Sequence, residues 1–511
     1  MMPSTHRRLT LLAGIVLLGL AQGAWLAGPA RAQDLAAFEK RVTEFTLANG
    51  LHFIVLERHE APVAAFLTFA NVGAVDEQRN KTGLAHVFEH MAFKGTRTIG
   101  TKDYTAEAKA LDKIDALFAE IEAERLRPNP DKARIEQLQG QFKQAQEEAK
   151  KYLVHDEFEE TLQRAGGQGL NAGTGSDQTM FFVNLPSNKG ELWMALESDR
   201  FLNPVFREFY KERDVIMEER RRSVESDPTG RLFEEFLGVA YKAHPYGTEV
   251  IGHMSDLEGL SRADAEAFFK KYYNPSNLTI AVVGDVDPHQ VRLWAEKYFA
   301  RVPKGPKPEP VLTVEPPQLG ERRVVVEDQA QPFVLIGYHK PGINHPDNAV
   351  YEAMTDIIGL GRTSRLYKTL VKDKRIAVQA SASQGVPGEK YPGLYVVYAV
   401  PSKGHTNEEC ELALTAEVEK FKTEPVSVEE LQKAKTRARA GLIRQLSSNN
   451  GLAQQLTYYQ VVTGDWRNLF RQLDRIDKVT ADDILRVAKE TFIRKNRTVG
   501  LIETMSAPKP D

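Results

Sequence analysis

The chain repeats one plan of strands and helices in two halves, and this repetition constrains its fold more than any other feature. An apolar run at residues 62–73 is predicted to form a strand that ends in a turn, and residues 332–342 repeat that pattern. A long charged helix follows in each half, at 207–225 and at 428–446. Repetition at roughly 220 residues is typical of a duplicated domain and not of a solenoid.

Each half closes with an amphipathic helix that leads into a β-rich run, at 260–286 and at 479–502. Strands and helices mix without strict alternation, which predicts two tandem α+β domains, each a mostly antiparallel sheet with helices on one face. Six prolines at 303–320 favour an extended linker. The predicted domains are therefore 33–302 and 321–506.

A polar, helix-forming segment at residues 103–163 interrupts the first half. Apolar residues recur in it at helical spacing, and two prolines within 127–131 end one helix and begin the next. We therefore expect an inserted helical hairpin that is self-contained, so that removing residues 105–152 should leave the rest of the domain assembled. A solvated arm is the favoured interpretation, and a surface for binding a partner is the alternative.

Charge and cysteine content exclude several classes of protein. With 67 Lys and Arg against 70 Asp and Glu, the formal net charge of the 511-residue chain is −3. Nucleic acid is therefore not an expected partner, because phosphate binding needs an excess of basic residues. Cys410, the single cysteine, permits neither an internal disulfide nor a four-cysteine zinc site, and it is expected to be a small buried residue.

The first 32 residues have the pattern of a secretory signal peptide. A basic pair precedes an apolar run at 9–20, and small residues within 30–32 predict cleavage after Ala32. The alternative is an uncleaved membrane anchor at 9–27. No later segment is long and apolar enough to span a bilayer. We therefore expect the mature chain to be exported, to a bacterial periplasm, without stable membrane insertion.

The strongest chemical signal is the motif H-x-x-E-H at residues 86–90. His86 and His90 lie i, i+4 apart, so on a helix both imidazoles face one side and can share a zinc ion at about 2.0–2.1 Å. Glu89 falls on nearly the same face, where it can hydrogen-bond a water molecule without being a ligand. A histidine pair alone is commonly structural, but the complete motif in an apolar helix predicts a metal site.

A catalytic zinc needs a third protein ligand and an open position. The charged helix at 209–225 offers Glu212 and Glu219, which lie seven residues apart on one face. A glutamate in such a helix is more often a solvated ion-pair partner. The spacing alone does not choose Glu219 over Glu218.

Three segments together resemble the pitrilysin/insulinase family of zinc metallopeptidases, which includes insulin-degrading enzyme and the mitochondrial processing peptidase. They are HVFEHMAFKGT at 86–96, NAGTGSDQT at 171–179 and KERDVIMEERR at 211–221. The resemblance extends over essentially the whole mature chain. It implies a peptidase whose two halves form a clam-like chamber that admits short or unfolded peptides.

The resemblance also implies the roles of individual residues. One Zn²⁺ per chain would be bound by His86, His90 and Glu219. Glu89 would act as the general base and Glu212 as a supporting acid. The interval of 129 residues between His90 and Glu219 is longer than usual in the family. The excess is about the length of the inserted hairpin, which leaves Glu219 in register.

Residues 170–186 are predicted to form a strand that begins at an Asn-Ala turn. In the family the corresponding strand is an exposed edge that pairs with the substrate backbone, and here it would offer Asn171, Ala172, Gly173 and Thr174. An ordinary sheet edge is the alternative. The sequence G-x-G-x-x-A at 167–172 precedes this strand instead of following one, so it does not indicate a dinucleotide site.

The chain lacks two substrate-binding side chains that the resemblance to the family leads us to expect. Residues 359–378 resemble the family segment that carries an Arg and a Tyr, seven residues apart, which reach the substrate across the chamber. Val371 and Val378 occupy those positions, and neither can donate a hydrogen bond. We therefore expect a homologous subunit to supply the pair in a heterodimer. Substitution from within the chain is the alternative, by Arg365, Lys372 or Arg375.

Two other functions remain open at this stage. The family contains members that only assemble or scaffold, so a non-catalytic core subunit is one alternative. A peptide-binding protein with a structural zinc is the other, although a structural zinc usually has four protein ligands and no fourth is evident. His244 and Tyr246 are expected in a structured loop near the site.

Overall fold

The computed structural model describes residues 38–505. The predicted signal peptide and its cleavage site after Ala32 lie outside the described residues. From Arg41 onward the described chain belongs to one structural unit.

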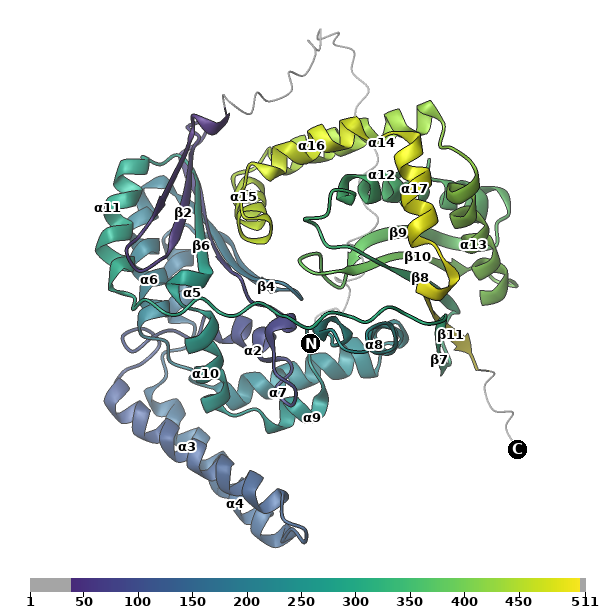
Figure 1. Cartoon of the computed structure of the whole chain (residues 1–511). Coiled ribbons are helices and arrows are strands. Elements are labelled where there is room, and N and C mark those ends of the chain that lie inside the picture. Colours follow the sequence, from purple (N-terminus) through teal and green to yellow (C-terminus); the bar gives the residue numbers. More distant parts are fainter. Residues whose placement is uncertain (1–37, 506–511) are drawn as a thin grey trace, which may run out of the picture. The chain divides into compact units, whose positions relative to one another are not determined.

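Two sheets, one in each half, form the framework (Figure 1). The first has the strand order β1-β2-β6-β3-β5-β4, with bounds Val42–Thr46, His52–Glu57, Leu278–Gly284, Val63–Ala70, Thr179–Pro186 and Gln168–Thr174. The second has the order β7-β11-β8-β10-β9, with bounds Arg322–Asp328, Arg497–Thr504, Phe333–Lys340, Gly393–Pro401 and Ala377–Val386. One neighbouring pair in each sheet is parallel, β2 with β6 and β7 with β11, and the other pairs are antiparallel.

The two sheets share one topology. Apart from β1, each strand of the first sheet has a counterpart at the same place in the second, and each sheet ends in an edge strand, β4 or β9. Each half also has its own apolar core, built largely from alternate residues of these strands and from the helices packed on them. The predicted fold class, a duplicated α+β domain with mostly antiparallel sheets, is confirmed.

Helices fill the segments between the strands. Those of the first half are α2 (Leu84–Met91), α3 (Tyr104–Arg125), α4 (Lys132–Ala149), α5 (Glu157–Arg164), α6 (Gly190–Leu202), α7 (Phe209–Arg220), α8 (Pro228–Ala240), α9 (Met254–Gly259), α10 (Arg262–Tyr272) and α11 (Pro288–Tyr298). Those of the second are α12 (Asn348–Gly359), α13 (Asn407–Thr423), α14 (Val428–Gln445), α15 (Asn449–Thr463), α16 (Asn468–Lys478) and α17 (Ala481–Thr491). A π-helical turn, Arg221–Glu225, continues α7.

The halves exchange one helix each. Helix α8 belongs to the first half but packs on β7 and β11 of the second sheet, and α15 of the second half packs on β6 and β3 of the first. Phe236 of α8 is fully buried there, opposite Gly337 and Gly500. Gly337 lies on the neighbouring strand β8, and a Cβ there would lie 2.7 Å from the Phe236 ring. The helix can therefore approach the sheet this closely only because the residue is glycine. Each sheet is therefore covered by both halves.

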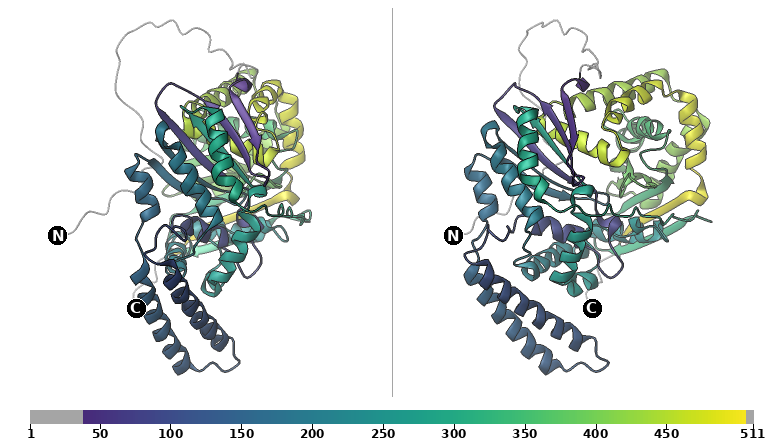
Figure 2. Two further views of the ribbon diagram at one scale, coloured as in Figure 1. Left: turned by 90° about the vertical axis from the view of Figure 1, so that its left-hand side faces the viewer. Right: turned by 60° about the vertical axis from the view of Figure 1, so that its left-hand side comes forward.

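The inserted hairpin consists of α3 and α4, which extend away from the sheets (Figure 2). Asp103 and Asp131 cap the two helices by accepting backbone N–H bonds. The hairpin proper ends at Ala149, because α5 is a separate helix whose Phe158 is buried in the core of the first half.

The expectation that the hairpin is self-contained is wrong for its first helix. Leu111, Ile114 and Phe118 of α3 belong to the core of the first half, and the Phe118 ring lies 4.7 Å from that of Tyr210 on α7. Helix α4 contacts the domain less, through Ala145 in the same core and through the Phe142 ring, which lies 5.1 Å from that of Tyr210. The apolar spacing in α3 therefore marks a face that packs on the domain, in addition to one that packs on α4.

Residues 170–186 form two strands, where the sequence predicts one. Asn171 and Ala172 lie inside β4 and not in a turn, and β4 and β5 are joined by a tight turn at 175–178. The turn closes with the N–H of Gly175 donating to the carbonyl of Gln178, at 2.8 Å. Its sequence, Gly-Ser-Asp-Gln, is rich in residues that favour turns, and this signal explains the break.

The segment 303–320 contains neither helix nor strand, in agreement with its proline content. It is fastened along its course, since the carboxylate of Glu315 accepts N–H bonds from Lys242, Ala243 and His244 after α8. The connection between the halves is therefore extended but held against the first half.

Candidate metal centre

Helix α2 presents the H-x-x-E-H motif on its polar face. Its other face is apolar and buried, through Leu84, Ala85, Val87, Phe88 and Met91. His86, Glu89 and His90 are partly buried and lie on the side away from that core. The spacing therefore acts as the sequence predicts, because burial of one stripe of the helix turns both imidazoles to the same side.

Helix α7 brings Glu219 to the two histidines. Its Oε2 lies 3.9 Å from Nε2 of His86 and 3.7 Å from Nε2 of His90. One ligand atom from each of the three side chains lies within 4.8 Å of the others. Two atoms bound to one zinc at about 2.1 Å stand about 3.4 Å apart at a tetrahedral angle, so small side-chain movements suffice to close the site on an ion.

The protonation of the site suits a metal. Burial, reinforced by the neighbouring His90, lowers the pKa of the His86 imidazole. The neutral imidazole is the form that binds a metal ion. Two imidazoles and one carboxylate, with no fourth protein ligand among residues 38–505, are a donor set typical of a catalytic zinc. The residues present therefore fit zinc.

Glu212 supports the site from two helical turns earlier on α7. Its Oε2 lies 3.6 Å from Nδ1 of His90, and its Oε1 lies 2.6 Å from Nζ of Lys94. Although burial favours the neutral acid, the bonds to His90 and Lys94 lower the pKa of Glu212 to about 2. An ionised carboxylate at Nδ1 orients the ring and leaves Nε2 facing Glu219.

Glu218, the alternative third ligand, points elsewhere. Its carboxylate pairs with Arg221 at 3.1 Å, and its side chain is exposed. The helix thus places Glu219 and not Glu218 beside the histidines.

Glu77 holds the beginning of α2, and the sequence analysis did not single it out. Its carboxyl oxygens accept the N–H groups of Gly83 and Ala85 at 2.8 and 2.7 Å. These are among the N–H groups that a helix leaves unpaired at its first turn. Gly83 has φ +89°, which only glycine adopts easily, and this fixes the entry into the helix. The sequence gives only a weak signal for this role, because no known capping motif connects a Glu to a helix that begins six or more residues later.

Strand β4 is the outer strand of the first sheet, next to α2. Asn171, Ala172, Gly173 and Thr174 all lie in it, and the hydroxyl of Thr174 donates to the carbonyl of Ala85 at 3.5 Å. The candidate peptide edge and the helix with the histidines are therefore in direct contact.

The loop of His244 and Tyr246 serves the contact between the halves. The Tyr246 hydroxyl donates to Oδ1 of Asp177 at 2.5 Å, in the β4–β5 turn. Oδ2 of the same carboxylate accepts the N–H groups of Glu389 and Lys390 from the second half. Asp177 is nearly fully buried, so this network is structural and not part of the metal cluster.

The two valines of the second half, at the positions where the family segment carries Arg and Tyr, lie in different surroundings. Val371 packs against the core of the second half, and Val378 is exposed on β9. Arg365 is engaged elsewhere, because its guanidinium pairs with Glu430 at 2.7 Å and lies over the ring of Phe421. Cys410 is buried, as expected.

Comparison with known proteins matches most of the chain. A family model described as insulinase (peptidase family M16) matches residues 53–122 and 145–253, and one described as the peptidase M16 inactive domain matches 259–438. The gap in the first match covers the outer part of the hairpin. Together the two models cover more than half of the chain.

Individual proteins are similar to this chain over most of its length. The zinc protease PqqE of Helicobacter pylori is 27% identical over 455 residues, which cover 88% of this chain and 89% of that protein. The crystal structure of a protease from Helicobacter pylori has a TM-score of 0.76 at 26% identity and covers 90% of this chain and 99% of that one. The periplasmic protease PqqL of Escherichia coli shares the fold, with a TM-score of 0.68 at 17% identity, over 91% of this chain and 48% of that one.

Within residues 38–505, the helices are all too short or too polar to cross a membrane.

The carboxyl group of Glu77 makes stability depend on pH. Burial raises its pKa to about 8, although the bonds from Ala85 and Gly83 oppose the shift. A raised pKa in the folded state stabilises the protein below the ordinary carboxyl pKa, and this contribution is lost as pH rises to about 8. For metal-free protein we expect the stability of wild type relative to Glu77→Gln to fall between pH 5 and 8, by at most about 1.4 kcal/mol per pH unit. Urea unfolding measures this, and a difference independent of pH would contradict it.

Proposed function

The chain belongs to the insulinase (M16) family of peptidases, and from this membership we propose that it is a zinc-dependent metallopeptidase that hydrolyses peptide bonds in short or unfolded peptides. The observation that carries the proposal is the convergence of His86, His90 and Glu219, with Glu89 on the same face of α2. Relatives over most of its length are named zinc proteases, which supports the metal and the class of reaction.

The three cluster residues would hold the zinc ion, and Glu89 would move the proton. Zinc bound there would lower the pKa of a water molecule in the open position to about 7 and polarise the scissile carbonyl. Glu89 would accept a proton from the attacking water and return it to the departing amine nitrogen. Glu212 would keep His90 oriented through Nδ1.

Strand β4 would bind the peptide. An edge strand offers its free N–H and C=O groups to an extended chain, so binding by Asn171–Thr174 would depend little on side chains. The contact of Thr174 with Ala85 on α2 supports the proposal, because it brings the peptide edge next to the helix that carries His86.

The complete metal set supports an enzyme over a scaffold subunit. A subunit that only assembles has no need of Glu89 or of three converging ligands. A structural zinc usually has four protein ligands, and the cluster has three among the described residues.

We also propose that a homologous subunit completes the active site. Val371 and Val378 replace the Arg and Tyr of the family segment, and Arg365 is held in an ion pair of its own half. Transition-state charge on the carbonyl oxygen would then receive no hydrogen bond from these two positions or from Arg365. A heterodimer, in which the partner supplies Arg and Tyr and this chain supplies zinc, resolves the deficit.

We place this peptidase outside the cytoplasm, in a bacterial periplasm. The support is the signal-peptide pattern of the first 32 residues.

Glu89→Gln should retain zinc and lose hydrolysis, because the residue moves protons and is not a ligand. We expect peptide cleavage to fall to no more than a few per cent of wild type, with metal content by atomic absorption unchanged. The assay is run with and without the homologous subunit. Turnover close to wild type would contradict the role given to Glu89.

Glu219→Ala should lose metal affinity as well as activity, whereas Glu218→Ala should change neither. The two positions are adjacent on α7, which makes Glu218→Ala a matched control for helix propensity and charge. Chelator competition measures the affinity. Normal zinc binding by Glu219→Ala, with loss in Glu218→Ala, would show that the register across the hairpin is off by one.

The purified single chain should bind zinc but cleave peptides weakly or not at all. Activity is expected when a homologous subunit that carries the Arg and Tyr is added. The same subunit with both residues replaced by Ala and Phe is the control and should restore nothing. Full turnover by a homogeneous preparation of this chain would contradict the partner proposal while leaving the metal site intact.

A further inference from the structure

Arg207 is buried at the point where the two ligand-bearing helices meet. It precedes α7 by two residues and is 2% exposed, as is its partner Glu107. Its Nε donates to Oε1 of Glu107 at 2.8 Å, and Nη2 donates to Oε2 at 3.1 Å. The remaining N–H groups donate to three backbone carbonyls, those of Lys94, Thr96 and Ile99.

Those carbonyls belong to the loop that directly follows α2. Gly95 and Gly100 in this loop have φ near +88° and +85°, and a Cβ at either would lie 2.9 or 2.8 Å from Nη1 of Arg207. The loop therefore wraps around the guanidinium, and only glycine permits so close an approach. Lys94 from the same loop reaches back to Glu212 on α7. The end of α2 and the start of α7 are thus joined through one side chain.

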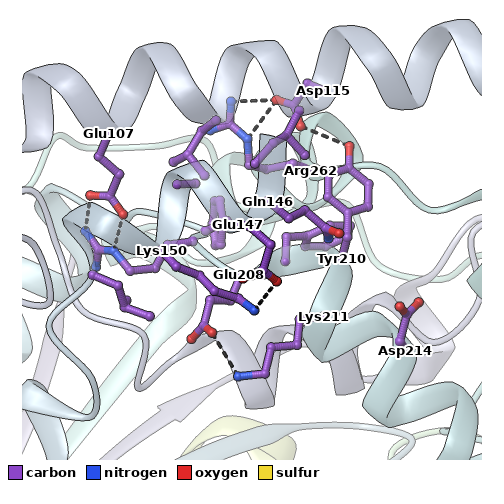
Figure 3. Close-up of a pocket in the computed structure, with 17 residues that line it drawn as sticks. Glu107, Asp115, Gln146, Glu147, Lys150, Glu208, Tyr210, Lys211, Asp214 and Arg262 are labelled. Carbon is purple, nitrogen blue, oxygen red and sulfur yellow. Dashed lines mark hydrogen bonds and ion pairs between the residues drawn. The ribbon is translucent and has the colours of Figure 1, made fainter. Parts of the chain in front are cut away.

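Burial of this cation requires an anion beside it, and the anion comes from the hairpin. A buried guanidinium without a partner strongly destabilises a fold. Glu107 lies in the first turn of α3, and further along α3 Asp115 accepts from Tyr210 of α7 at 2.9 Å (Figure 3). A cavity of about 190 Å³ lies between the hairpin and the start of α7, and Glu107, Arg207 and Asp115 are among the residues that line it.

We propose that Arg207 is a positioning residue, which sets the distance of His86 and His90 from Glu219, and that Glu107 of the inserted hairpin supplies its counter-charge. The base of the hairpin is then part of the framework of the metal centre. This inference rests on the proposed function, because it presupposes that the three side chains bind a metal ion.

Substitution of the pair tests the proposal, with zinc affinity as the readout. Arg207→Lys keeps the charge but cannot reach three carbonyls, and Glu107→Gln keeps the shape but removes the charge. Both should weaken zinc binding by about 10- to 100-fold in chelator competition, a loss typical of groups that orient ligands. With Co²⁺ in place of zinc, the visible absorption spectrum should change, since it reports ligand geometry.

The chain provides a matched control in Arg200 and Glu197. This pair is also buried, in α6, with both side chains 4% exposed, and Glu197 bonds to Thr68 of β3. Arg200→Lys and Glu197→Gln should lower the free energy of unfolding without changing zinc affinity or the cobalt spectrum. Zinc affinity lowered equally by both pairs would reduce Arg207 to a general stabilising role and overturn the proposal.

Two deletions separate the base of the hairpin from its tip. Removing residues 120–140 and joining the ends by a short Gly-Ser linker leaves Glu107, Asp115 and the contact of Phe118 with Phe142, and zinc binding should persist. Removing residues 105–152 should abolish it. Should Arg207→Lys fail to fold, Glu107→Gln carries the test. Normal zinc binding by Arg207→Lys would overturn this proposal alone, whereas a wild type that binds no zinc would overturn the proposed function as well.

Discussion

The candidate metal centre depends on holding three potential ligand atoms, from two helices far apart in sequence, within reach of one another. Neither helix can do this by itself, since α2 carries both histidines and α7 carries Glu219. The structure fixes α2 at both ends, by the carboxyl group of Glu77 at its start and by Arg207 at the loop after it. Lys94 and Glu212 then link the two helices next to the ligands.

These supports are polar groups buried at a cost in stability. Burial raises the pKa of Glu77 to about 8, and Arg207 and Glu107 are a fully desolvated ion pair. Apolar residues of similar size often stabilise a fold equally well in such places. What the polar groups add is direction, because a guanidinium with three backbone acceptors fixes a loop in one arrangement. A site whose ligand atoms must lie within a few tenths of an ångström benefits from that constraint.

The sequence predicts the features that are local and misses those that join distant segments. The duplicated sheets follow from alternating apolar runs, and the face of α2 follows from the spacing of His86 and His90. Glu77 and Arg207 act on segments that no periodicity connects to them, so they gave no usable signal. The sequence predicts a self-contained hairpin because two prolines separate two helices whose length matches the excess spacing, yet part of the apolar stripe of α3 packs on Tyr210. The turn at 175–178 was missed although its composition favours a turn.

The two halves share one topology, but only the first carries the H-x-x-E-H motif. Helices α8 and α15 occupy equivalent places, each after the long charged helix of its half, and each covers the sheet of the other half. The first sheet, with β3 and β6 under α15, therefore needs the second half even though that half carries no H-x-x-E-H motif. The packing role of the second half does not require a hydrogen-bond donor at Val371 or Val378, since Val371 packs in the core of that half and Val378 is exposed on β9. The contribution of the second half that the structure shows is therefore the cover that α15 gives to the first sheet.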